Sequence, residues 1–440
     1  MDDKNMTFDK ISRDLTSHIR INKGFLIWMG FLILALGICI YAYTLQLRLG
    51  LGVAGIRDYI SWGLYISNFV FFVATSLIGM LISGVLGLIG MKWVTPLTRI
   101  AETIAVAFAA VAGLVIVSDM GRPERLANVF LYGRFQSPIF WDVTVVTTYF
   151  TLSLLLLFLP LIPDMALIHK NGNSIPGWLR PVYKVLSLKW ANKPAQNQII
   201  HRSIRILLIL LIPAALSIHT VTSWLFAVTS RAGWDSTIFG PYFVTGAFVA
   251  GSAAVIIAMY FFRNNYKLKD YITDLHFNNM GKVLVLVSLV YLYFNINEFL
   301  VPGYKLKRAE AGHLQELLTG THAFLFWAVQ LGGLIIPCVL LLIRKFRKPL
   351  PITLISVAVI IGAWFKRYII VVPTQEHPFL PIQHVPQNFI VYTPTLIESL
   401  ITIGPMILVL IIITLISKFF PVIPLYETAV EKGIETIKID

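Results

Sequence analysis

The sequence predicts an all-α polytopic membrane protein with about ten transmembrane helices. Apolar residues make up 57% of the 440 residues and charged residues only 13%, whereas roughly a quarter of a soluble domain is charged. The strict alternation of a transmembrane β-barrel is absent, so the apolar runs are predicted to be helices. The predicted spans are 25–45, 59–89, 97–117, 138–162, 203–228, 241–262, 280–300, 321–343, 351–372 and 394–417.

The Lys and Arg residues predict the orientation of these spans. With ten spans, both terminal segments and the loops after the even-numbered spans share one side of the membrane. They hold more than two thirds of the 36 basic residues. Cytoplasmic loops carry such an excess, so both termini are predicted to be cytoplasmic. The net charge of +14 is then explained by topology and lipid contact, without nucleic acid.

The loops on the opposite, outer side contain most of the polar residue types that bind ligands. Residues 119–137, 229–240, 301–320 and 373–393 are rich in Trp, Pro, His and acidic residues. The stretch 118–142 keeps three arginines and several carboxylates between two apolar runs, where unpaired charges are costly. We therefore expect a ligand site at the outer boundary of the membrane.

Several classes of cofactor site are not supported by the residues present. Cys39 and Cys338 lie in separate predicted helices, so no thiolate site for a metal or an iron–sulfur cluster is expected. Of the nine histidines, only His219 is well inside an apolar run, whereas a membrane haem needs two facing histidines. Phosphate loops, hydrolytic triads and metal-ligand spacings are also missing. Any redox cluster is expected to belong to a partner protein.

Three polar residues near the outer boundary have both structural and functional interpretations. Asp142 at the start of the fourth span follows Trp141, and it either pairs with Arg122 or Arg134 or contacts a ligand. His219 shares one helical face with Thr222 and Ser223, where it is either a packed ring or a titratable contact for a quinol hydroxyl. Asn68 could bind a carbonyl ligand or, as is more common, a neighbouring helix.

Three glutamates within the predicted helices are candidates for a proton pathway. Glu102 lies beside a face of small residues, and a carboxylate there must be protonated, paired or hydrated. Glu298 ends the seventh span, where the helix C-terminus disfavours an anion, so Lys366 or Arg367 is an expected partner. Glu398 is a further buried candidate. Each glutamate could equally be a structural hydrogen-bonding group.

Seven segments in order resemble the NrfD-like family of polysulfide reductase membrane subunits. The similarity runs from about residue 59 to 415, and within the family it is greatest to the ten-helix membrane subunits of alternative complex III and of related sulfur-metabolism complexes. The segments are DMGRPERL (119–126), SPIFWD (137–142), HTVTSW (219–224), GWDSTIFGPYFV (233–244), NEFL (297–300), FKRYIIVVPT (365–374) and YTPTLIESLITIGP (392–405).

The resemblance implies a quinone-binding subunit of a multisubunit respiratory oxidoreductase in a prokaryotic cytoplasmic membrane. Such a subunit exchanges electrons between menaquinone or ubiquinone and a docked extracytoplasmic iron–sulfur protein, and it binds no haem or cluster itself. Other membrane and cytochrome subunits are further expected partners, and proton translocation is a further expected activity. The implied divisions are a cytoplasmic segment (1–24), a flanking helix with an outer loop (25–58), two four-helix bundles (59–228 and 229–372) and a final region with the last helix (373–440).

The resemblance places Asp119, Arg122, Trp141, Asp142, His219 and Asp235 at family motif positions, and the residue patterns described above add the other candidates. Asp142 or Asp235, together with His219, is expected to accept the quinol protons. The expected quinone-binding residues are Asn68, Ser76, Asp119, Arg122, Trp141 and Trp224, and the expected proton-pathway residues are Glu102, Glu298 and Glu398.

Two departures from the family pattern affect these assignments. The second span has no His between residues 71 and 83, where some relatives carry one, so Asn68, Ser76 or His219 would have to replace it. The segment Phe365–Tyr368 has a Lys where the family has an acid, which weakens the case for a proton path there. A membrane anchor without a quinone and a secondary transporter are the alternatives. Polar residues gathered toward one face, and not at the midplane, argue against the transporter.

Overall fold

The computed structural model describes residues 8–171, 176–229, 231–377, 386 and 389–434, and every regular element in them is helical. The segment 378–385 of the predicted outer loop 373–393 lies outside the described residues. The longer elements are α1 (Phe8–Thr16), α2 (Lys23–Leu49), α3 (Leu64–Ser76), α4 (Thr95–Asp119), α5 (Asn128–Leu131), α6 (Pro138–Phe158), α7 (Leu161–Asn171), α8 (Arg180–Leu186), α9 (Pro194–Ala227), α10 (Phe239–Asn265), α11 (Asp274–Lys305), α12 (Arg308–Leu318), α13 (Ala323–Trp327), α14 (Ile336–Leu342), α15 (Pro349–Gln375), α16 (Leu396–Phe419) and α17 (Leu425–Glu431).

Shorter helical turns join these elements. The π-helices are η2 (Met80–Leu86) and η6 (Ala328–Ile335), and the 3₁₀ turns are η1 (Leu51–Val53), η3 (Lys92–Val94), η4 (Pro123–Arg125), η5 (Gly177–Leu179) and η7 (Arg344–Arg347). Each π-helix continues an apolar helix within a membrane span, α3 in one case and α13 in the other. Such wide turns often occur near functional sites.

The ten predicted spans are confirmed: ten helices in the described residues are long and apolar enough to cross a membrane. Their bounds differ from the prediction in two informative places. The second span begins at Leu64 and not at residue 59, because the side chain of Gln375 bonds both the backbone N–H and the carbonyl of Trp62, at 3.0 and 2.6 Å, and keeps that residue out of the helix. The predicted outer loop 301–320 contains the end of α11 and all of α12.

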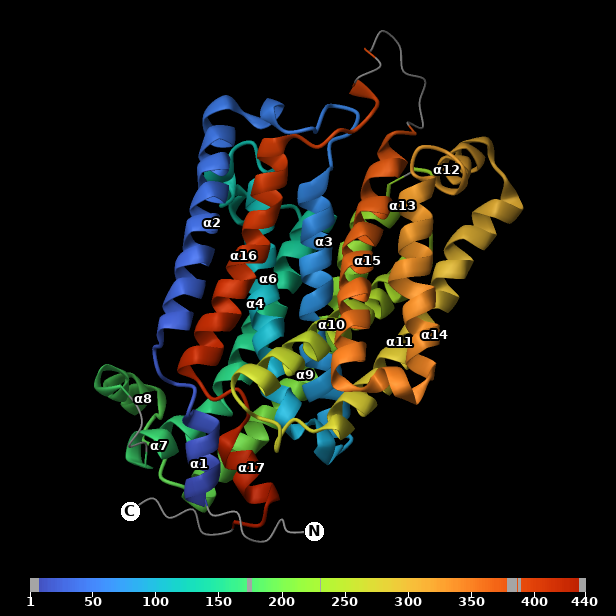
Figure 1. The fold of residues 1–440 in the computed structure, drawn as a ribbon. Helices are drawn as coiled ribbons and strands as arrows, with labels where there is room; N and C mark the ends of the chain where they lie inside the picture. Colours follow the sequence, from blue (N-terminus) through green and yellow to red (C-terminus); the bar gives the residue numbers. More distant parts are fainter. Residues whose placement is uncertain (1–7, 172–175, 230, 378–385, 387–388, 435–440) are drawn as a thin grey trace.

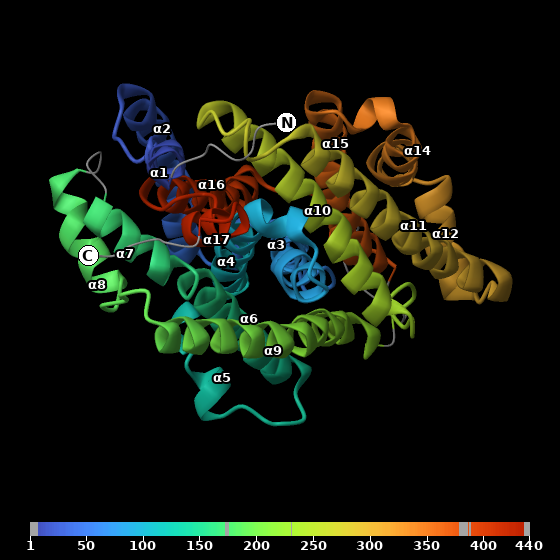
Figure 2. The ribbon, with the colours of Figure 1, turned by 90° about the horizontal axis from the view of Figure 1, so that it is seen from below.

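The spans pack as two groups of helices with a flanking pair (Figures 1 and 2). We call α3, α4, α6 and α9 the first group, and α10, α11, α13–α14 and α15 the second group. Helices α2 and α16 pack against each other, and α16 packs on α4. The two groups meet where α3 contacts α10 and α15. The residue boundaries predicted for two four-helix bundles stay a prediction.

Close backbone contact holds part of the second group together. A Cβ atom added to Gly333 on η6 would lie 2.7 Å from the Cα of Gly362 on α15. Only residues without a side chain allow two helices to approach this closely. Substitution at either glycine would therefore separate η6 from α15.

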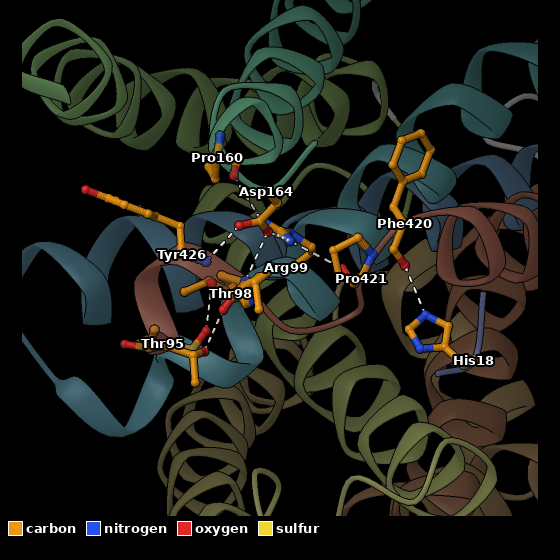
Figure 3. Close-up of polar contacts among 12 residues, drawn as sticks. His18, Thr95, Thr98, Arg99, Pro160, Asp164, Phe420, Pro421 and Tyr426 are labelled. Carbon is orange, nitrogen blue, oxygen red and sulfur yellow. Dashed lines mark hydrogen bonds and ion pairs between the residues drawn. The ribbon is translucent and has the colours of Figure 1, made fainter. Parts of the chain in front are cut away.

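A buried ion pair joins four segments at the end of the molecule where α1 and α17 lie (Figure 3). The guanidinium of Arg99 on α4 bonds the carboxylate of Asp164 on α7, and both side chains are at most 2% exposed. Arg99 also donates to the carbonyls of Pro160 and Pro421, at 3.1 and 3.3 Å. Asp164 accepts from the backbone N–H groups that begin α17, including that of Tyr426 at 2.8 Å.

We call this end of the molecule the inner end and the opposite end the outer end, following the prediction from charge. The carbonyl of Phe420, which precedes Pro421, also bonds the ring of His18 at 3.2 Å. Burial lowers the pKa of His18 to about 4, so this ring is neutral near pH 7. The segment before α2 is thus attached to the inner end without a buried charge.

We predict that replacing Asp164 with Asn destabilises the protein strongly, because Arg99 would remain buried without its counter-charge. The expected loss in free energy of unfolding is roughly 3–5 kcal/mol. Urea or detergent unfolding of the purified protein measures it. Arg202→Gln, at an exposed position of α9, is the matched control and should change the free energy by less than about 0.5 kcal/mol. Equal stability of Asp164→Asn and the control would contradict the anchoring role.

Candidate functional site

Asp142 lies at the outer start of α6 and is only 5% exposed. Its carboxylate oxygen Oδ1 accepts a hydrogen bond of 2.5 Å from the hydroxyl of Thr222 on α9. Within the described residues it forms no ion pair, and Arg122 and Arg134 are exposed in the preceding loop. The ion-pair interpretation of Asp142 is therefore wrong, and a hydroxyl is its partner. A carboxylate with one neutral donor keeps lone pairs free for a second donor.

His219 lies on the same polar face of α9 as Thr222. His219, Thr222 and Ser223 are all at most 1% exposed, which confirms that they share a buried face. The ring of His219 lies against the backbone of Val73 on α3 and near Arg367 of α15. Its Nε2 atom has no hydrogen-bond partner among the described residues. A buried ring nitrogen in this condition is uncommon and points to a missing contact.

The two alternatives to His219 are fully used by the fold. The side chain of Asn68 donates to the carbonyl of Thr402 at 3.0 Å and accepts from the indole of Trp364 at 3.1 Å. The hydroxyl of Ser76 donates to the carbonyl of Val73 at 2.7 Å, one turn earlier in α3. Among the three predicted replacements for the missing histidine, His219 alone has a free polar atom.

The aromatic residues predicted to contact quinone lie close together on α6 and α9. The rings of Trp141 and Trp224 meet edge to face with centroids 6.2 Å apart, and Trp224 is 42% exposed. The indole N–H of Trp141 donates to the carbonyl of Phe135 in the preceding loop. Together the two rings form an aromatic surface on α6 and α9, next in sequence to Asp142 and two positions after Thr222.

The remaining predicted residues of the outer end fall into two sets. Arg122 and Asp235 are exposed, and Asp235 interacts electrostatically with Glu298 on α11. Asp119 is half-buried at the end of α4, with its Oδ1 atom buried and without a hydrogen-bond partner among the described residues. It interacts electrostatically with Glu398, so it belongs to the region between α4 and α16.

The three predicted proton-pathway glutamates lie in three different environments. Glu398 accepts from the backbone N–H groups of Gly55 and Leu64, at 2.7 and 3.2 Å, and from the hydroxyl of Tyr392, as expected of a structural group. Glu102 lines a pocket of about 190 Å³ with Ser83 and Ser153 within the first group. The third, Glu298, lies in the second group.

Glu298 and its predicted partner Lys366 line one pocket at the outer end of the second group. The two side chains attract each other electrostatically, which supports the predicted pairing with Lys366. Asn295, one turn before Glu298, instead accepts from the hydroxyl of Tyr242 at 2.8 Å and donates to Gln330 at 2.7 Å. Asn295 therefore holds α10, α11 and η6 together.

Two residues of this pocket were not predicted from the sequence. Glu310 and His313 lie on α12 and are 9% and 6% exposed. They were missed because residues 301–320 have no sustained apolar run and were assigned to a loop. The spacing of Glu310, His313, Leu314 and Leu317 along one helical face was the available signal.

No group of three or more His, Cys, Asp or Glu side chains in the described part of the chain is arranged to hold a metal ion. The candidate site is the outer part of the first group, with Asp142, Thr222 and His219 as its polar residues. It offers a carboxylate with spare lone pairs, an imidazole nitrogen without a partner and an aromatic border. These features suit a flat ligand with hydroxyl or carbonyl groups.

Curated relatives match nearly the whole chain. A selenate reductase subunit of Mesobacillus selenatarsenatis is 26% identical over 86% of this chain and 90% of its own length. The Hdr-like menaquinol oxidoreductase integral membrane subunit of Archaeoglobus fulgidus is 24% identical over 90% and 92%. The menaquinone reductase integral membrane subunit of Nitratidesulfovibrio vulgaris is 22% identical over 91% and 92%.

A family model agrees with these relatives and covers most of the chain. The model described as polysulphide reductase, NrfD, matches residues 52–378, which include both helix groups and the candidate site. The expectation from the seven sequence segments is confirmed. The chain is an integral membrane protein of the NrfD polysulphide reductase family.

Proposed function

We propose that this chain is the quinone-reactive membrane subunit of a respiratory oxidoreductase complex. The observation that carries the proposal is the buried polar face formed by Asp142 and Thr222, with His219 one turn away. Relatives that match 90% or more of the chain are integral membrane subunits of a menaquinol oxidoreductase and of a menaquinone reductase. Menaquinone is therefore the proposed ligand.

Quinol oxidation requires two proton acceptors and an apolar surface for the quinone ring, and this part of the protein offers both. Oxidation breaks two O–H bonds and releases two protons and two electrons. The carboxylate of Asp142 and the Nε2 atom of His219 are the proposed acceptors of the two protons. Thr222 fixes the Asp142 carboxylate in place, and Trp141 and Trp224 provide apolar surface for the ring. In quinone reduction the same groups would return the protons.

In this proposal the electrons pass to or from another subunit of the complex, in keeping with the relatives that are integral membrane subunits of a menaquinol oxidoreductase and a menaquinone reductase. We propose an iron–sulfur protein docked on the outer end, which is the end nearer to Asp142. The charge distribution supports an extracytoplasmic position for that end, with both termini in the cytoplasm of a prokaryotic cell. Arg122, which is exposed in the outer loop, is then available for contact with the partner.

We retain Glu102 and Glu298, but not Glu398, as candidates for a proton-translocation pathway through this subunit. Glu102 and Glu298 each line a pocket, which leaves room for water beside a carboxylate. Glu398 is saturated by backbone and tyrosine donors, so we assign it a structural role. Asp235 is exposed, so we favour Asp142 as the carboxylate at the quinone.

We predict that Asp142→Asn and His219→Phe each lower menaquinol-dependent turnover of the intact complex at least about 100-fold, because each removes one proton acceptor. Turnover is measured in membranes with a soluble menaquinol analogue. Thr147→Val on α6 and Ser217→Ala on α9 are the matched controls, because both positions are exposed on the same helices. Co-purification of the partner subunits checks that each complex is assembled. Full turnover by an assembled Asp142→Asn complex would refute the role of this carboxylate.

A second prediction separates a quinone site from a simple membrane anchor. The purified complex should bind a quinol analogue such as a heptyl-hydroxyquinoline N-oxide, and Thr222→Val should weaken binding by about tenfold, because the carboxylate loses the side-chain donor it has among the described residues. Quenching of the analogue's fluorescence measures the dissociation constant. A wild-type complex that binds no analogue would favour the anchor.

A further inference from the structure

A pocket in the described residues lies in the second group and not at Asp142. It is bounded by α10, α11, α12 and α15 at the outer end, and its space, with the open solvent at its mouth included, is about 450 Å³. Its polar wall includes Glu298, Glu310, His313 and Lys366. Neither the proposed quinone chemistry at α6 and α9 nor the family match accounts for it.

Three buried polar atoms of this wall lack hydrogen-bond partners among the described residues. They are Oε2 of Glu298, Oε2 of Glu310 and Nδ1 of His313. They come from two different helices, α11 and α12, and all three residues line the same pocket. Buried polar groups are nearly always hydrogen-bonded, so three unpaired atoms around one cavity indicate that something polar occupies it.

Both acidic side chains of the pocket face a cation. Glu298 is opposed by Lys366, and Glu310 has its other oxygen 3.9 Å from the ammonium group of Lys307. Burial, together with the neighbouring His377, His322 and Lys366, lowers the pKa of His313 to about 4, so its ring is neutral near pH 7. A site in which each acidic side chain faces a cation and the imidazole is neutral suits a neutral ligand that both donates and accepts hydrogen bonds.

The rest of the wall is apolar and aromatic. Tyr242, Phe299, Leu314, Leu317 and Ile369 are among its residues. The ammonium group of Lys366 lies 4.6 Å from the centroid of Phe299, which orients it along the aromatic surface. Water alone would leave this apolar wall wetted, whereas a ring-shaped head group would cover it and also reach the polar atoms.

A lipid-soluble ligand has a route to this pocket. Phe299 and Pro302, which line it, adjoin Leu300 and Val301 on α11, which are 61% and 47% exposed on a membrane-spanning helix. An isoprenoid tail could therefore lie along the outer surface of α11 while the head group is enclosed. The outer end of α11 thus has both an enclosed polar position and an adjacent apolar track.

We propose that the second group binds a second quinone or quinol head group in this pocket, separate from the site at Asp142. The inference rests on the proposed function for its ligand class, and it assigns binding only, without electron transfer at this position. The acidic oxygens and His313 accept the hydroxyls of a quinol, and Lys366 donates to the carbonyls of a quinone. The protein would then hold two quinone molecules on two different helix groups.

Photo-labelling of the wild-type complex with an azido-naphthoquinone, followed by peptide mapping, tests this. We expect two labelled regions, one on α6 or α9 and one on α11, α12 or α15, each protected by excess unlabelled menaquinone. Labelling of α6 or α9 alone would mean that the second pocket holds only water and would overturn the inference. Labelling of the second group alone would overturn the proposed site at Asp142 and retain the second site.

Variants assign the second label to the pocket. His313→Phe and Leu314→Trp should reduce labelling of α11, α12 and α15 at least tenfold, by removing an acceptor and by filling the cavity, while labelling of α6 and α9 continues. Gln315→Ala, at an exposed position of α12, should retain both labels. Retention of the second label in both pocket variants would contradict the assignment. The protection experiment uses only the wild-type complex, so its result remains valid even where a variant fails to fold.

Discussion

The ion pair between Arg99 and Asp164 is the contact on which the inner end of the molecule depends. Taking these two charges out of water costs several kcal/mol per ion, and only direct pairing with further hydrogen bonds can offset that cost. The pair meets this condition because the backbone carbonyls of Pro160 and Pro421 and the N–H groups that begin α17 add hydrogen bonds to it (Figure 3). Segments distant in sequence are thereby held at fixed positions.

The requirement that buried polar groups find hydrogen-bond partners also separates structural polar residues from candidate functional ones at the outer end. Asn68, Gln375 and Glu398 have their hydrogen bonds satisfied by other helices and loops, and each ties two distant segments together. His219 and Glu298 instead keep a buried polar atom without a partner among the described residues. Because buried polar atoms are usually hydrogen-bonded, a ligand or water is expected at these two residues.

Much of the fold could be predicted from the sequence, because long apolar runs determine membrane spans almost without regard to tertiary contacts. The start of the second span could not be predicted, because Gln375, more than 300 positions away in the sequence, holds Trp62 outside the helix. Helix α12 could not be predicted for a similar reason, because its apolar face is short and becomes buried only against other helices, α11, α13 and α15. The shared face of His219 and Thr222 followed from helical spacing, whereas the bond from Thr222 to Asp142 required knowing that α6 and α9 are neighbours.

The central claim is that a quinone head group binds between α6 and α9 at Asp142 and His219. The most direct measurement is an electron cryo-microscopy structure of the whole complex with a bound quinone analogue. The account predicts a head group within hydrogen-bonding distance of the Asp142 carboxylate and of Nε2 of His219, bordered by Trp141 and Trp224. A complex saturated with the analogue, in which this position is filled by protein side chains alone, would contradict it.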